Sequence, residues 1–154
     1  MDNSEIIDSV GEFHKTFGHP ILDKPEIPSS DRCKLRVSLI REELEELEKA
    51  IENSDLVEVA DAMCDLQYVL AGAILEFGLG NKFLPLFREV QRSNMSKACN
   101  SMQEAKETIK FYKEQNNTDC VCKEVGNKFL VYRLADNKIM KSIYYSPANL
   151  KPLI

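Results

Sequence analysis

The chain has 154 residues, which is enough for one domain with a real hydrophobic core. Its 25 acidic residues outnumber the 20 basic ones, for a formal net charge of −5, and no basic block interrupts the sequence, so a dedicated nucleic-acid binder is excluded. The five cysteines are an odd number, the N-terminus is not signal-like, and the apolar stretch at 66–75 is too short to span a bilayer. We therefore expect a cytoplasmic protein with neither a membrane nor a nucleic acid among its partners.

Apolar side chains at helical intervals predict a run of helices over most of the chain. The predicted helices cover residues 4–17, 30–52, 55–78, 82–92 and 96–115. Prolines at positions 20, 25 and 28 predict an extended connector between the first two helices. The connection at 53–55 is so short that the third helix is expected to return antiparallel beside the second.

The third predicted helix changes character along its length. From Leu66 to Leu75 its only polar side chains are Gln67 and the Tyr68 hydroxyl, so this half must be surrounded by other apolar surface. Either the other helices of this chain or a second copy of the subunit must cover it, and a homodimer of the four-helix-bundle type would do both; a tetramer is the alternative assembly.

Beyond Asn117 the pattern changes to that of β-strands. Strands are expected at 121–125, 129–133 and 138–144, as an antiparallel hairpin or a three-strand meander. The predicted fold is mainly α, a four-helix-type bundle completed by dimerisation. We expect a helical domain at 1–117, with a short β-rich extension at 118–154 packed on it.

Two acidic pairs on the second and third helices carry most of the chemical information. Glu43 and Glu46 are three residues apart, as are Glu58 and Asp61, so each pair projects from one side of its helix. Asp65 continues the second row beside the apolar half, where an unpaired carboxylate would be costly. Hard oxygen ligands at this density are typical of a Mg²⁺ site, with Mn²⁺ as a substitute.

These acidic residues also have structural interpretations. Charged runs such as EELEELEK usually form a solvated helix face, and Asp55 with Glu58 matches a capping box. Both histidines, His14 and His19, precede the second helix, so the Glu-x-x-His pattern of di-iron bundles is absent.

Several short motifs resemble those of one protein family. They are FHxxFGxP at 13–20, EExxE at 42–46, ExxD at 58–61 with Asp65, SNMSK at 93–97, DNKxxKS at 136–142 and YSPAxL at 145–150. Together they resemble the all-α nucleoside triphosphate pyrophosphohydrolases, the MazG-like and phosphoribosyl-ATP pyrophosphohydrolase-like proteins. Only eleven residues separate Glu46 from Glu58, slightly fewer than is usual there, so Asp61 and Asp65 compete for the last ligand position.

The resemblance implies hydrolysis of the bond between the α- and β-phosphates of an NTP or dNTP, giving the monophosphate and pyrophosphate. The implied Mg²⁺ ligands are Glu43, Glu46, Glu58 and Asp61 or Asp65. Either Glu42 or Glu43 is the candidate for activating water.

The resemblance also implies which residues bind the nucleotide. Asn94 and Lys97 would face the leaving pyrophosphate, and Arg36 or Lys141 are lesser candidates for that role. His14 would lie near the base.

Two other hypotheses remain at this point. The chain could be a non-catalytic helical module that binds a partner protein, or a regulatory nucleotide binder that retains metal without turnover. Ser93 and Asn94, taken alone, are also typical of a helix cap before Ser96.

Overall fold

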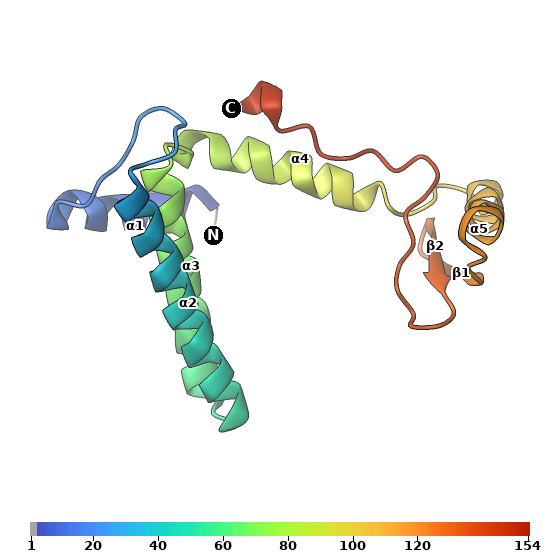
Figure 1. Ribbon diagram of the computed structural model, residues 1–154, viewed down its shortest axis with the longest axis horizontal. Helices are drawn as coiled ribbons and strands as arrows, with labels where there is room; N and C mark the ends of the chain where they lie inside the picture. The colour runs from blue at the N-terminus through green and yellow to red at the C-terminus, as the bar shows by residue number, and fades with distance from the viewer. Residues whose placement is uncertain (1–2) are drawn as a thin grey trace. The chain divides into compact units, whose positions relative to one another are not determined.

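The computed structural model describes residues 3–154, with side chains from Glu5 onward. The fold is mainly α, 61% helical, with five α-helices and one small two-stranded sheet in this described part (Figure 1). The chain divides into two compact units, one up to Leu84 together with Ile154 and one of Pro85–Leu153, and each is described by itself. The two units meet at Leu84 and Pro85 and not at 117/118. The domain boundary predicted at 117/118 stays a prediction.

The first unit holds three α-helices close to the predicted bounds. They are α1 (Asn3–Phe17), α2 (Ser30–Glu52) and α3 (Leu56–Glu76), followed by the 3-10 turn η1 (Gly80–Lys82). The proline-containing connector between α1 and α2 is extended, and its backbone is tied to the end of α3. Leu22 N donates to Leu75 O at 3.1 Å, and Glu26 N donates to Phe77 O at 3.2 Å.

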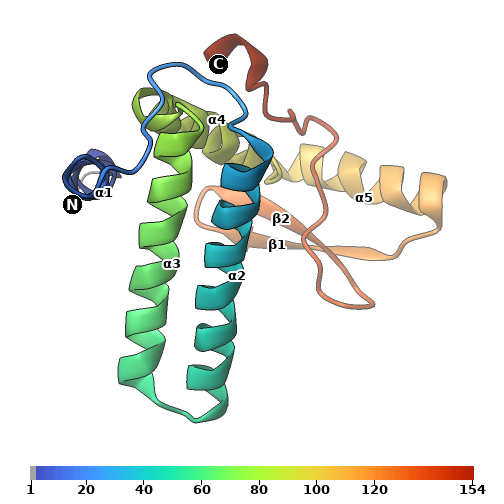
Figure 2. The ribbon, with the colours of Figure 1, turned by 60° about the vertical axis from the view of Figure 1, so that its left-hand side comes forward.

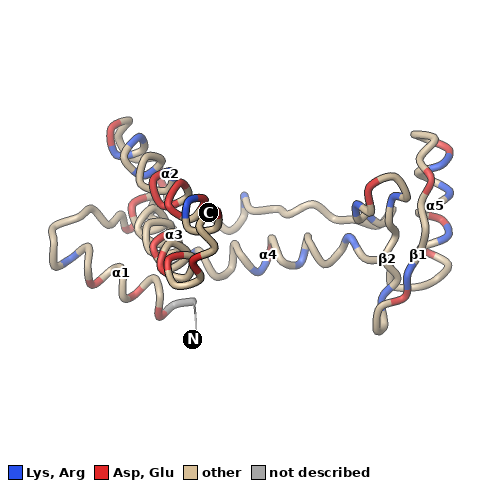
Figure 3. The backbone as a smooth tube through the Cα atoms, turned by 90° about the horizontal axis from the view of Figure 1, so that it is seen from below, with Lys and Arg blue, Asp and Glu red and all other residues tan. Residues whose placement is uncertain are grey.

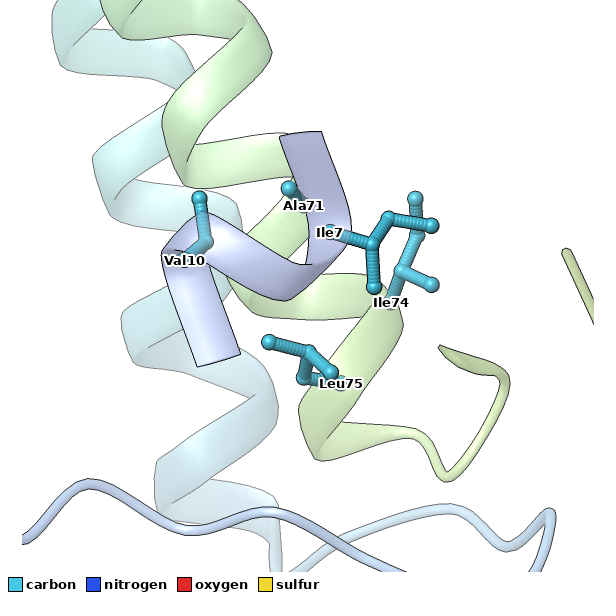
Figure 4. Close-up of a cluster of buried hydrophobic side chains, with 5 residues drawn as sticks. All are labelled: Ile7, Val10, Ala71, Ile74 and Leu75. Carbon is cyan, nitrogen blue, oxygen red and sulfur yellow. The ribbon is translucent and has the colours of Figure 1, made fainter. Parts of the chain in front are cut away.

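The core of the first unit lies where α1 crosses the apolar half of α3 (Figure 4). Its buried members are Ile7, Val10, Ala71, Ile74 and Leu75. This half of α3 is predicted to need a cover of other apolar surface, and α1 of the same chain supplies part of that cover. Neighbouring apolar side chains of the same helix stay open, since Leu70 is 43% exposed.

The second unit contains most of α4 (Phe83–Met95), then α5 (Met102–Asn116), β1 (Cys120–Val125), β2 (Lys128–Arg133) and the 3-10 turn η2 (Lys151–Leu153). The two strands pair as an antiparallel hairpin, with Val125 opposite Lys128. The turn residue Gly126 has a φ of +60°, a conformation that glycine adopts without strain. α5 packs on this hairpin around the buried residues Cys99, Ala105 and Val131.

Two predictions about the second unit are wrong. The helix predicted at 96–115 begins only at Met102, because Cys99 exchanges backbone hydrogen bonds with Phe129 and Ser101 caps the helix by accepting from Glu104 N at 3.1 Å. The strand predicted at 138–144 is reduced to a single bridge between Tyr132 and Ile139. The hairpin alternative, not the three-strand meander, is the one that forms.

In the described residues no single helix has both the length and the apolar character needed to cross a bilayer. The consecutive segments Leu56–Glu76 and Gly80–Met95 meet that requirement only when they are taken together.

Candidate active site

The α2–α3 hairpin sets the two acidic pairs opposite each other. The helices run antiparallel side by side (Figure 2), and Asp55 caps α3 by accepting from Val57 N at 3.0 Å and Glu58 N at 3.2 Å. Near the turn, small side chains fill the space between the helices, since Ala50 and Ala62 are only 6% and 4% exposed. Both helices carry acidic residues (Figure 3), most of them in the halves nearest the turn, at 42–52 of α2 and 58–65 of α3.

Glu43 is an acidic residue of α2 on which negative charges of both α2 and α3 act. Its side chain is half-buried, whereas Glu42 and Glu46 are exposed. Burial raises the pKa of Glu43, and the negative charges of Asp65, Glu46, Glu42 and Asp61 raise it further. Carboxylates from both helices are therefore near enough to repel each other, as the opposed-pair prediction requires.

Three of the predicted metal ligands line one open pocket of about 370 Å³. The pocket is lined by Glu46, Lys49, Ala50, Asn53, Asp55, Glu58, Asp61 and Ala62. Glu43 and Asp65 are not among its lining residues, although Asp65 acts electrostatically on Glu43. Glu46 and Asp61 link the two sets of predicted ligands, because they line the pocket and also act on Glu43.

The acidic residues fit a magnesium ion that also binds a substrate. Within the described part of the chain, no three Asp, Glu, His or Cys side chains converge closely enough to hold an ion by themselves. Mg²⁺ is usually held by one or two carboxylates together with phosphate and water oxygens, so such a convergence is not required. The all-oxygen donor set suits this ion, and neither histidine lines the acidic pocket.

A second pocket of about 300 Å³ lies between α1, α2 and α3. Its lining is mostly apolar and includes Val10, Phe13, His14, His19, Arg32, Leu35, Arg36, Leu39, Tyr68 and Val69. The Phe13 ring stacks on His19, with centroids 5.7 Å apart, and meets Tyr68 edge-on at 5.6 Å. This pocket offers flat aromatic surfaces to a ligand.

Arg36, a predicted substrate-binding residue, lies in a buried ion pair instead of facing solvent. It and Arg32 both donate to the carboxylate of Glu76, whose side chain is fully buried. Burial alone would raise the pKa of Glu76, but hydrogen bonds from the two arginines outweigh it and hold the pKa below its usual value. Arg36 Nε is buried without a hydrogen-bond partner among the described residues.

His14 joins the same network and is fixed in one neutral tautomer. Its Nδ1 lies 2.9 Å from the carbonyl oxygen of Pro20, which only accepts, so Nδ1 carries the proton. Its Nε2 then accepts from Arg36 Nη2 at 3.2 Å. Burial is the main cause that lowers the pKa of His14.

Sequence reasoning missed Glu76. The signal was present, because a charged residue directly follows the apolar run that ends at Leu75. A buried carboxylate requires partners, but the sequence does not reveal that two arginines of α2 would supply them.

The remaining predicted binding residues lie in the second unit. Lys97 Nζ donates to Asn94 Oδ1 at 2.8 Å, so these two side chains come together. Lys141 Nζ lies 4.3 Å from the centre of the Tyr145 ring. The helix-cap interpretation of Ser93 and Asn94 is wrong, because both lie inside α4.

Comparisons with known proteins agree with the resemblance in the sequence. A family model described as phosphoribosyl-ATP pyrophosphohydrolase matches residues 10–94, which is more than half of the chain. An uncharacterized protein of Acanthamoeba polyphaga mimivirus is 25% identical, over 95% of this chain and 94% of that protein.

Proposed function

This chain belongs to the phosphoribosyl-ATP pyrophosphohydrolase family and has a pyrophosphohydrolase-like activity on nucleotides, and from that premise we propose that it is a Mg²⁺-dependent nucleoside triphosphate pyrophosphohydrolase. The proposed reaction hydrolyses the α–β phosphoanhydride of an NTP or dNTP, giving the monophosphate and pyrophosphate. The observation that supports it most is the electrostatic coupling of Glu43 to acidic groups of both α2 and α3.

The carboxylates would hold the ion together with the triphosphate. The proposed ligands are Glu43, Glu46, Glu58 and Asp61, with Asp65 as the alternative to Asp61. When bound, Mg²⁺ neutralises phosphate oxygens that the acidic residues would otherwise repel. Glu42 or Glu43 is proposed to take a proton from the attacking water, because a carboxylate beside the ligand residues is within reach of it.

The base of the nucleotide is proposed to occupy the aromatic pocket of the first unit. Phe13 and Tyr68 are partly exposed there, at 37% and 39%, and present flat surfaces for stacking. Arg36 also lines this pocket, and its guanidinium is proposed to contribute to the wall that faces the base. His14, being tied to Pro20 and Arg36, would orient that guanidinium.

The assembly is proposed to be a homodimer, in which a second copy covers apolar side chains left open in one chain. On α2, Val37, Leu44 and Ile51 are spaced by seven residues and are 55%, 46% and 58% exposed. On α3, Leu56, Met63 and Leu70 repeat the same spacing and are 79%, 55% and 43% exposed. A seven-residue apolar row is typical of a helix that packs against another helix.

The first prediction is loss of turnover when the acidic cluster is neutralised. Glu43→Gln and Asp61→Asn are each expected to lower kcat by about 100-fold or more, because a proton acceptor or a metal ligand is lost. The measurement is pyrophosphate release from a panel of NTPs and dNTPs with millimolar Mg²⁺. Glu48→Gln is the control, since this exposed glutamate lies on the same helix outside both pockets.

Circular dichroism must show that the variants remain helical. Full activity in both Glu43→Gln and Asp61→Asn would refute the assignment. A wild type that releases no pyrophosphate but melts at a higher temperature with Mg²⁺ would instead be a non-catalytic metal and nucleotide binder. An unchanged melting temperature as well would point to a helical partner-binding module.

A further inference from the structure

The segment after the hairpin is fixed to α4 within the second unit. Arg92 Nη2 donates to Pro147 O at 3.1 Å, and Asn149 N donates to Glu89 Oε1 at 2.8 Å. The carboxylate of Glu89 also accepts hydrogen bonds from Nε and Nη2 of Arg92, each at 2.8 Å. The backbone that carries Tyr145 is therefore held in place beside α4.

Within the described part of the chain, the Tyr145 hydroxyl accepts a hydrogen bond through its oxygen and donates none through its hydrogen. Ser93, only 4% exposed, donates to Tyr145 Oη at 3.2 Å. Because the phenol oxygen accepts this bond, its own hydrogen remains available for an acceptor outside the chain. The ring is partly exposed, so a ligand has access to it.

The charged groups that act on this hydroxyl are all cations. The hydrogen bond from Ser93 is the largest cause that lowers the pKa of Tyr145, and the positive charges of Lys141, Lys97 and Arg92 lower it further. Arg92 donates to the carboxylate of Glu89, whereas Lys97 donates to the neutral amide of Asn94. Among the described residues, neither Lys97 nor Lys141 forms an ion pair with a carboxylate, so two ammonium groups act on the Tyr145 hydroxyl.

We propose that Tyr145 is a binding residue for pyrophosphate within the second unit, donating its hydroxyl hydrogen to a phosphate oxygen beside Lys97 and Lys141. The ligand class is inorganic pyrophosphate, the product of the proposed reaction. This inference rests on the proposed function. Hydrogen bonds to charged phosphates are stronger than those between neutral groups, so one hydroxyl contributes appreciably to affinity.

Isothermal titration of the full chain with inorganic pyrophosphate tests this inference. EDTA is included, so that the acidic residues of the first unit, which need a cation to accept phosphate, do not contribute. Tyr145→Phe is expected to weaken pyrophosphate binding by about tenfold. Tyr144→Phe, at a neighbouring tyrosine that is 67% exposed, is expected to bind as the wild type does.

Ser93→Ala separates direct contact from positioning of the segment. It removes the anchor but keeps the phenol, so its affinity should stay within about threefold of the wild type. Equal weakening in Ser93→Ala and Tyr145→Phe would overturn the proposal, as would wild-type affinity in Tyr145→Phe. Pyrophosphate should also change the near-ultraviolet spectrum of wild type and Tyr144→Phe alike; an unchanged spectrum overturns the proposal whatever the fold of Tyr145→Phe.

The outcomes separate this inference from the proposed function. If the wild type releases pyrophosphate from nucleotides while Tyr145→Phe binds pyrophosphate normally, only the inference fails. If pyrophosphate binding depends on Tyr145 but no nucleotide is hydrolysed, the binding site stands and the proposed function fails.

Discussion

His14 is a buried neutral side chain whose neighbours influence its protonation. Its Nε2 accepts from Arg36, so adding a proton there would set two positive donors against each other. Burial is the leading cause of its lowered pKa; Arg36 and His19 lower it further, while the bond to Pro20 and the charge of Glu76 oppose them. The folded chain therefore binds a proton at His14 less readily than the unfolded chain does.

The folded chain is expected to lose stability as the pH is lowered, because His14 then takes up a proton more readily in the unfolded chain. Because the folded pKa lies below the ordinary 6.5, the contribution of His14 is fully present above pH 6.5 and is lost as the pH falls below it. Urea unfolding between pH 7.5 and 5 measures this effect. His14→Gln should show a shallower loss of unfolding free energy than the wild type, whereas His19→Gln, which removes only a lesser cause of the shift, should show a smaller change. Parallel pH profiles in all three chains would contradict the prediction.

At the scale of the helices, the packing of α2 against α3 depends on the missing side chain at Gly72. A Cβ added there would lie 2.7 Å from Arg36 Nη1 and 3.0 Å from His14 Nε2. The guanidinium cannot move aside freely, because Glu76 and His14 hold it. The absence of a side chain at Gly72 thus leaves room for the buried network of His14, Arg36 and Glu76, which joins α1, α2 and α3.

Gly72→Ala and Gly11→Ala form a matched pair that tests this packing. Both place alanine inside a helix, which by propensity alone stabilises by up to about 1 kcal/mol. A Cβ at Gly11 would meet only Leu75 Cδ1 at an ordinary 3.9 Å. We expect Gly11→Ala to be neutral or stabilising and Gly72→Ala to destabilise by about 1–3 kcal/mol through overpacking. Equal melting temperatures for the two variants would show that the network tolerates displacement.

The predictions of helices and strands are correct where contacts between residues close in sequence determine the structure. They are wrong where contacts between residues far apart in sequence determine it. Asp55 caps α3 as its sequence predicts, since the bond is made within three residues. The segment 96–101 has a helical pattern but is not helical, because Cys99 pairs with the backbone of Phe129 thirty residues later. No local pattern contains that pairing.

For the whole molecule, the proposed dimer follows from apolar rows that one chain leaves exposed. Leu44→Lys and Met63→Lys place a charge in the middle of the rows on α2 and α3. Each is expected to shift the mass in solution from twice that of the chain to that of one chain, because burying an unpaired ammonium group in an interface is costly. Light scattering after size-exclusion chromatography measures this mass. Glu48→Lys is the control, and a wild type that is already monomeric would contradict the dimer.

The sequence by itself determined most of the helices, the mainly α fold and the family, because capping residues, apolar periodicity and the spacing of the EExxE and ExxD motifs are properties of short segments. The tertiary structure alone decided which charges lie together. It brought Glu43 within electrostatic reach of Asp65, and it placed Glu76 between two arginines of α2. The physical reason is that burial and Coulomb interactions depend on distances between helices, which one-dimensional patterns do not contain.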